Sequence, residues 1–203
     1  MPIYELPEDG IRSRPIYRPM QPDVAARFHL MVAEGAGSEA LAELHEKLPD
    51  DARCSIHYLA GGDGPDGSDR LMQLRCEQTR LHFDDGQLAD ALRRHLESAA
   101  MGTRLYVAGS EDFIWRMAAV GISCGMSEEE IHVERRGSRA RPVQCVHCKT
   151  RVEGVTTIIY TCPGCGQHVT VRDHFSRRLG AYQSVCVDAE APGELPPIEE
   201  IYR

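Results

Sequence analysis

The sequence lacks the segments that would direct it into or across a membrane. No apolar run approaches the roughly 18 residues that a bilayer-spanning helix needs. The first ten residues include Glu5, Glu8 and Asp9, and they have neither the basic start nor the apolar centre of a secretory signal. We therefore expect a cytoplasmic protein of a bacterial type of cell, without membrane contact.

Recognisable catalytic arrangements are also lacking. No combination of Ser, His and Asp, and no pair of carboxylates, stands at a spacing that indicates a nucleophile or a general acid and base. Neither Cys-x-x-Cys pair is followed by His, because Lys149 and Gly166 stand at those places, so the attachment motif of a c-type haem is absent. The sequence predicts no catalytic residue and leaves open whether the chain belongs to an enzyme.

Aromatic residues are scarce where positive charge gathers. Nine basic and three acidic residues lie between Glu134 and Gln183, a local charge of +6 in a chain whose total is −8. Such a segment suits an acidic protein surface or nucleic acid. Nucleic-acid-binding ribbons usually expose aromatic side chains for base stacking, and this segment has Tyr160, Phe175 and Tyr182 alone. Nucleic acid is therefore the less favoured partner.

Four of the eight cysteines stand in two Cys-x-x-Cys pairs, C-V-H-C and C-P-G-C. Each turn presents two thiolates to one point, so two turns build a tetrahedral four-sulfur site that suits zinc or a single iron. Iron knuckles usually have Gly after both pairs, whereas Lys149 follows the first pair and Gly166 the second. The sequence thus favours a structural zinc ribbon, with a rubredoxin-like iron as the alternative. The predicted ligands are Cys145, Cys148, Cys162 and Cys165.

The remaining cysteines are single and have apolar neighbours. They are Cys54, Cys76, Cys124 and Cys186. Free cysteine is among the most buried residue types, and tight pairing of the other four indicates a reducing compartment with one metal site. We expect the single cysteines to be buried small hydrophobic side chains.

Apolar and amphipathic segments alternate between residues 27 and 136. Strands are predicted near 28–33, 54–60, 79–83, 103–109 and 131–134, and helices near 38–48, 87–100 and 111–122. Ser38 is the expected N-cap of the first helix, and Ser127 with Glu130 has capping-box spacing. This alternation predicts a Rossmann-like α/β fold with a mostly parallel five-stranded sheet. Residues 139–170 show no helical period and indicate a small β-rich module, with a short helix expected near 175–179.

The segment from 27 to 136 resembles the nucleotide-binding domain of phthalate dioxygenase reductase-like proteins. EGAGS at 34–38 stands where that family has its glycine-rich phosphate turn, and LYVAG matches its fourth strand. The resemblance implies weak or vestigial nucleotide contacts at Gly35, Gly37, Ser38 and Gly109. However, Glu34 brings negative charge to the turn, and Ala-Gly-Ser at 108–110 replaces the family's Cys-Gly-Pro. We favour a domain that has kept this fold and lost its redox function.

The whole chain resembles the A-subunit family of bacterial dimethylamine monooxygenase. The resemblance is carried by the order of the two modules and by HFSRRLGAYQSVCVDAE at 174–190. It implies an NADPH-driven complex in which a haem-bearing subunit demethylates the amine and a flavin and iron–sulfur reductase delivers electrons. This chain is then expected to be a non-catalytic, zinc-binding accessory subunit. The alternatives are a rubredoxin-like electron carrier of the same complex and, less favoured, a nucleic-acid-binding zinc ribbon.

The expected domain boundaries follow composition and these resemblances. Residues 1–26 contain five prolines and predict an extended arm laid over a surface. We place the degenerate reductase-like domain at 27–138 and the ribbon module at 139–187. An acidic, proline-rich tail occupies 188–203.

Overall fold

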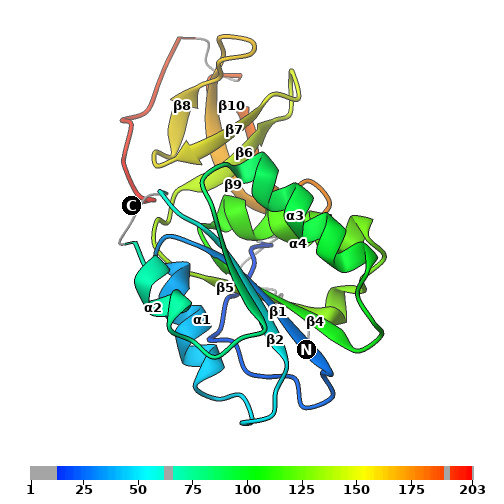
Figure 1. Cartoon of the computed structure of the whole chain (residues 1–203). Coiled ribbons are helices and arrows are strands. Elements are labelled where there is room, and N and C mark those ends of the chain that lie inside the picture. Colours follow the sequence, from blue (N-terminus) through cyan, green and yellow to red (C-terminus); the bar gives the residue numbers. More distant parts are fainter. Residues whose placement is uncertain (1–12, 62–65, 190–192, 203) are drawn as a thin grey trace. The chain divides into compact units, whose positions relative to one another are not determined.

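The chain forms two compact units (Figure 1). The computed structural model describes residues 13–61, 66–189 and 193–202. Unit 2 is Tyr17–Gly137, and unit 1 comprises the described residues before 17 and after 137. Each unit has its own sheet, so each is treated separately below.

Unit 2 is built on a five-stranded parallel sheet. Its strands are β1 (Phe28–Glu34), β2 (Cys54–Leu59), β3 (Gln78–His82), β4 (Thr103–Gly109) and β5 (Ile131–Arg135). They lie in the order β3-β2-β1-β4-β5, and every neighbouring pair runs parallel. The strands β1, β2 and β4 are buried along most of their length, as expected for a sheet covered on both faces. This topology confirms the predicted Rossmann-like α/β class.

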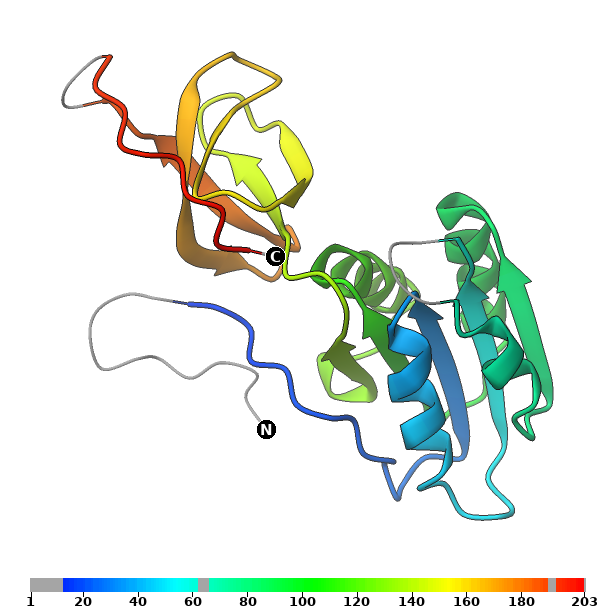
Figure 2. The ribbon, with the colours of Figure 1, turned by 90° about the vertical axis from the view of Figure 1, so that its left-hand side faces the viewer.

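Helices cover both faces of this sheet, a layering that can be followed in Figure 2. They are α1 (Gly37–His45), α2 (Ser68–Met72), α3 (Asp85–Glu97) and α4 (Glu111–Ser123). Leu41 of α1 shares one buried cluster with Ile56 of β2, and α2 adds Leu71 to it. Phe113 of α4 shares the other cluster with Leu105 of β4 and residues of α3. Apolar burial on two faces thus holds unit 2 together.

The start of α1 differs from the prediction. The helix begins at Gly37 with Ala36 at the N-cap position, so Ser38 lies inside the first turn. The Ser38 hydroxyl donates to the carbonyl of Gly35 at 2.9 Å. Ser38 therefore closes the glycine turn from within the helix, and the prediction that it is the N-cap was wrong.

Two other helices differ from the prediction, and one predicted cap is present. Helix α3 begins before the predicted start because the Asp84 carboxylate accepts from the Gln87 N–H. Helix α2 lies between two predicted strands, where no helix was predicted. The capping box of Ser127 and Glu130 is confirmed, in a 3-10 turn that leads into β5.

Unit 1 contains a second five-stranded sheet. Its strands are β6 (Arg141–Cys145), β7 (Arg151–Val155), β8 (Ile159–Thr161), β9 (His168–Ser176) and β10 (Ala181–Cys186). Their order is β7-β6-β10-β9-β8, in which β6 and β10 are parallel and the other pairs antiparallel. The predicted β-rich module is confirmed.

The short helix expected near 175–179 was wrong. Strand β9 continues to Ser176, and a turn in which the Gly180 N–H donates to Arg177 O at 3.2 Å leads into β10. Phe175 and Tyr182 face each other across this hairpin with ring centroids 4.9 Å apart. Cross-strand packing outweighs the weak local helical preference of this segment.

The flanking segments lie on their own chain. Within unit 1, Ser13 bridges His174 of β9, and the Ile158 N–H donates to Glu199 O of the tail. Within unit 2, the Tyr17 hydroxyl donates to Glu111 at 2.7 Å. Residues 1–12 of the predicted arm lie outside the described residues. Among the described residues, the helices are all too short or too polar to cross a membrane.

Candidate metal centre

The two Cys-x-x-Cys turns converge in unit 1. The first turn starts at Cys145, the last residue of β6, and the second starts at Cys162, directly after β8. The sulfurs of Cys145 and Cys165 are 3.9 Å apart, and those of Cys148 and Cys162 are 3.5 Å apart. All four sulfurs lie within 4.8 Å of one another. The structure therefore brings the four predicted ligands to one point.

Both turns have the same backbone geometry. The Lys149 N–H donates to Cys145 O at 2.9 Å, and the Gly166 N–H donates to Cys162 O at 2.8 Å. Gly166 has a φ of 73°, and Lys149 has a φ of 66° although it carries a side chain. Lys149 thus adopts a conformation that favours glycine. The missing glycine does not change the turn, so it no longer distinguishes zinc from iron.

Hydrogen bonds and burial shift the pKa values of two of the thiols in opposite directions. Bonding by the hydroxyl and backbone N–H of Thr150 lowers the pKa of Cys148 to about 6. A hydrogen bond from the Gln167 N–H lowers the pKa of Cys165, but burial and the neighbouring thiols outweigh it and raise that pKa to about 12. A bound metal would remove this difference because it deprotonates each coordinating thiol.

The sulfur spacing fits a tetrahedral metal. Zinc–sulfur bonds of about 2.3 Å in tetrahedral geometry place sulfurs roughly 3.8 Å apart, and the observed separations are 3.5 and 3.9 Å. Cys145 and Cys162 are fully buried, whereas Cys148 and Cys165 are partly exposed. Four thiolates fill a four-coordinate shell and leave no place for a reactive water. Metal binding by this cluster stays a prediction.

The predicted nucleotide contacts also meet, at the carboxyl ends of β1 and β4 in unit 2. Gly35 has a φ of 46° in the turn after β1, which favours glycine. A Cβ added to Gly37 would lie 2.2 Å from Ala108 O, so this glycine permits α1 to approach β4. A Cβ on Gly109 would lie 2.7 Å from the Glu34 side chain. The glycines serve close packing of this chain, and nucleotide binding by them stays a prediction.

Glu34 lies at the same edge and bonds to its own chain. Its Oε1 accepts from the Ser110 N–H at 3.1 Å and from the Ser110 hydroxyl at 2.5 Å. Burial raises the pKa of Glu34, although the two bonds from Ser110 act against this rise. In sheets of this order, ligands bind outside the carboxyl ends at the switch between β1 and β4. Here a carboxylate of the chain lies at that switch.

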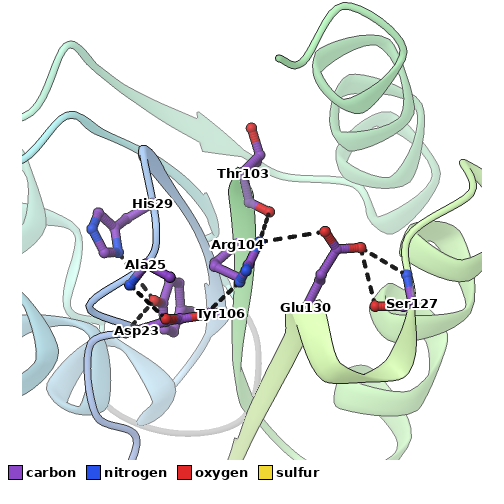
Figure 3. Close-up of polar contacts among 8 residues, drawn as sticks. All are labelled: Asp23, Ala25, His29, Thr103, Arg104, Tyr106, Ser127 and Glu130. Atoms are coloured by element: carbon purple, nitrogen blue, oxygen red, sulfur yellow. Dashed lines mark hydrogen bonds and ion pairs between the residues drawn. The ribbon is translucent and has the colours of Figure 1, made fainter. Parts of the chain in front are cut away.

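A separate polar network lies at the amino-terminal edge of the same sheet (Figure 3). Arg104 of β4 contacts Asp23 at 2.5 Å and Glu130 at 3.3 Å. The Tyr106 hydroxyl accepts from the Asp23 N–H and lies 3.0 Å from Nδ1 of His29. These contacts tie the segment before β1 to β4 and to the turn before β5. We interpret this network as structural.

Sequence reasoning missed a line of three histidines. The Nδ1 of His57 is 3.0 Å from Nε2 of His82, and its Nε2 is 3.3 Å from Nδ1 of His95. Burial, followed by the charges of the other two histidines, lowers the pKa of His57 to about 3. The three residues come from β2, β3 and α3, so no sequence spacing indicates the line.

A close pair of single cysteines was missed as well. The sulfurs of Cys54 and Cys76 are 2.9 Å apart. Cys54 is buried as expected, but Cys76, Cys124 and Cys186 are partly exposed, so the expectation for those three was wrong. Position offers the only signal: Cys54 opens β2, and Cys76 stands just before β3.

The sequence matches family models for both domains of dimethylamine monooxygenase subunit DmmA-like proteins. The N-terminal domain model matches residues 9–131, and the C-terminal domain model matches residues 142–185. The chain belongs to this family. One relative is the heme-dependent oxidative N-demethylase delta subunit of Ectopseudomonas mendocina (strain ymp), which is 35% identical to this chain over 180 residues. The match covers 89% of this chain and 91% of that relative's length.

Solved structures resemble the chain more distantly. Phthalate dioxygenase reductase is 16% identical with a TM-score of 0.45, over 85% of this chain and 68% of that one. The siderophore-interacting protein SipS from Aeromonas hydrophila is 18% identical with a TM-score of 0.38, over 61% of this chain and 55% of that one. The fold assignment of this DmmA-like chain rests on its own strand order.

Proposed function

We propose that this chain is a non-catalytic, zinc-binding accessory subunit of a cytoplasmic, NADPH-driven, haem-dependent dimethylamine monooxygenase. Its partners would be a haem-bearing subunit that performs the oxidation and a reductase that carries flavin and an iron–sulfur cluster. Membership of the DmmA-like family supports this proposal. The relative named as a delta subunit of a heme-dependent oxidative N-demethylase supports it further, because the match extends over both units.

One observation carries the non-catalytic role. The Glu34 carboxylate lies at the switch between β1 and β4 and accepts two hydrogen bonds from Ser110, the N-cap of α4. A dinucleotide phosphate at this edge would meet a carboxylate instead of unoccupied backbone donors. The proposal therefore assigns unit 2 to docking in the complex and assigns nucleotide binding to the reductase.

The four clustered cysteines support the zinc-binding part. They would hold the ion through Cys145, Cys148, Cys162 and Cys165. When bound, zinc would supply folding energy to unit 1 and no open coordination position. Among the described residues, no further donor joins these four in their cluster.

Co-purification and metal analysis test the proposal together. The tagged chain is co-expressed with the haem-bearing and reductase subunits in medium that contains both iron and zinc. We expect a stable complex, one zinc per accessory chain and no NADPH binding by the isolated chain in calorimetric titration. Failure to bind either partner, or micromolar NADPH binding by the isolated chain, would count against an accessory, non-catalytic role.

A rubredoxin-like electron carrier is the second candidate. It is favoured by the glycine-like conformation of Lys149, which gives both turns the same backbone geometry, and by the partial exposure of Cys148 and Cys165. A single iron held there would exchange electrons between the reductase and the haem subunit. Iron in stoichiometric amount, with thiolate absorption bands that bleach on reduction, would establish this candidate in place of the zinc proposal.

A further inference from the structure

We propose that Cys54 and Cys76 form a reversible intrachain disulfide, so that this pair is a redox modification site in unit 2 that reacts with low-molecular-weight disulfides. The site is independent of the metal centre and of the proposed role in an oxygenase complex. It rests on the position of the two sulfurs in the sheet, on their separation and on the cavity beside them.

Sheet pairing holds the two cysteines together. Cys54 is the first residue of β2, and Cys76 stands two residues before β3, the strand that pairs with β2 in parallel. The Glu77 N–H donates to Cys54 O at 2.8 Å, which fixes the backbone directly beside the pair. The sulfurs are thus brought together by regular strand pairing between residues 22 positions apart.

The sulfur separation distinguishes this pair from the metal centre of the same chain. The two sulfurs are 2.9 Å apart, whereas the metal-centre sulfurs are separated by 3.5 and 3.9 Å. Two thiolates on one tetrahedral zinc lie roughly 3.8 Å apart, so 2.9 Å is too close for that arrangement. A disulfide bond of about 2.05 Å requires an approach of roughly 0.9 Å more. The geometry favours a bond between the sulfurs.

The two cysteines differ in how accessible they are from solvent. Cys76 lines an open cavity of about 580 Å³ together with His45, Glu46 and Arg75. Cys54 is 1% exposed and does not line the cavity. The cavity therefore admits a small oxidant to Cys76, while Cys54 is placed to react with the sulfur of Cys76.

The reaction balances as two thiol–disulfide exchanges. The thiolate of Cys76 attacks one sulfur of a disulfide R–S–S–R, which forms a mixed disulfide and releases one R–S⁻ that takes up the proton lost by Cys76. Cys54 then attacks the Cys76 sulfur, which forms the Cys54–Cys76 bond and releases the second R–S⁻, protonated by the proton lost from Cys54. The chain loses two electrons and two protons, and R–S–S–R becomes two R–SH. In the reduced pair, the hydrogen bond between the two sulfurs lowers the pKa of Cys54 and raises that of Cys76. Access from the cavity, rather than acidity, therefore selects Cys76 for the first attack.

Peptide mapping of the full-length protein tests the proposal directly. Trypsin cleaves after Arg53 and Arg75, so the two cysteines begin the separate peptides 54–70 and 76–80. The purified chain is equilibrated with glutathione disulfide, alkylated, digested and analysed by mass spectrometry. We expect these two peptides to be joined by a disulfide and to separate after reduction with dithiothreitol. The peptide 117–135, which carries Cys124, should stay alkylated as a single thiol.

Two variants strengthen this test. Cys76→Ser should abolish the linked peptide, whereas the matched change Cys124→Ser in the same unit should leave it unchanged. The oxidised wild-type protein should unfold several degrees higher than the reduced one, because the bond restricts the unfolded chain, and Cys76→Ser should show no such shift.

Either of two results would overturn the proposal. One is a wild-type protein in which glutathione remains attached to Cys76 and the two peptides never join. The other is loss of one bound metal per chain in the double variant Cys54→Ser/Cys76→Ser, since His45 lies within 4.8 Å of both sulfurs and would complete a three-donor metal site.

Discussion

The two units differ in the kinds of side chain that they bury. In unit 2, helices cover both faces of the sheet, and side chains such as Leu30, Leu105 and Phe113 are fully buried. In unit 1, Cys145 and Cys162 are themselves part of a small buried cluster with Val169. Unit 2 therefore has an apolar core on each face of its sheet, whereas unit 1 buries apolar side chains such as Val143 and Phe175 and gathers four thiols beside them. We therefore expect the stability of unit 1 to depend on a metal held by these four thiols.

The two units also differ in how they use cysteine. Unit 1 holds four sulfurs at separations suited to a shared metal, and unit 2 holds two at a separation suited to a direct bond. The residue type is the same in both places. The spacing imposed by the surrounding strands therefore favours a different chemistry in each unit.

Metal removal should cause the largest difference in stability between the two units. We expect chelation, or the change Cys145→Ser, to unfold unit 1 and leave unit 2 folded, because apparent zinc-binding free energies in small modules are about 10 kcal/mol or more. Nuclear magnetic resonance spectra of the labelled chain would report each unit separately. The matched change Cys186→Ser in unit 1 should have little effect, and a chelated protein with unit 1 intact would break the comparison.

A cavity in unit 2 should produce the opposite pattern. Truncating Leu105, which is fully buried between β4 and the helices α3 and α4, to Ala should cost about 2–5 kcal/mol of unfolding free energy. The bound metal should be unaffected, because the cluster belongs to unit 1. Urea unfolding with parallel metal analysis measures both quantities, and loss of metal in the Leu105→Ala variant would contradict the independence of the units.

Mild acid should act on unit 2 through His57. Its pKa is lowered to about 3 in the fold from an ordinary value of 6.5, so the unfolded chain binds a proton where the folded chain does not. Stability that is present above pH 6.5 is then lost as the pH falls toward 3, by on the order of 2 kcal/mol between pH 7 and pH 5. Urea titrations at several pH values give the unfolding free energy of unit 2 as a function of pH. The slope of this dependence should be shallower in His57→Asn than in the wild type. An unchanged slope would mean that other groups dominate.

The smallest effect is expected at Glu34. Its raised pKa favours the neutral form in the fold, so its contribution is present below its ordinary pKa of 4.5 and is lost as the pH rises through the folded value. Glu34→Gln keeps an acceptor for Ser110 and does not titrate. Wild-type stability relative to this variant should fall as the pH rises from 4.5 to 7, by no more than about 1.5 kcal/mol. A difference that does not change with pH would show that Glu34 titrates normally.

Much of the fold was predictable because its signals are local. Alternating apolar and amphipathic segments indicated the parallel sheet, and the capping box before β5 was visible as Ser127 and Glu130. Helix α2 and the position of Ser38 were not, since the former is short and the latter is decided by how the glycine turn closes. The predicted helix near 175–179 failed because hairpin packing of Phe175 on Tyr182 outweighs local preference.

The sequence by itself determined the alternation of strands and helices in unit 2 and the two short turns that present thiols in unit 1. Both depend on spacings of a few residues, because backbone geometry places residues at these spacings on one face of an element or in one turn. Only the tertiary structure decided that Glu34 bonds to Ser110, that His57 lies between two histidines and that Cys54 meets Cys76. These partners are separated by more than 20 residues, and strand pairing brings them together through contacts that no local pattern records.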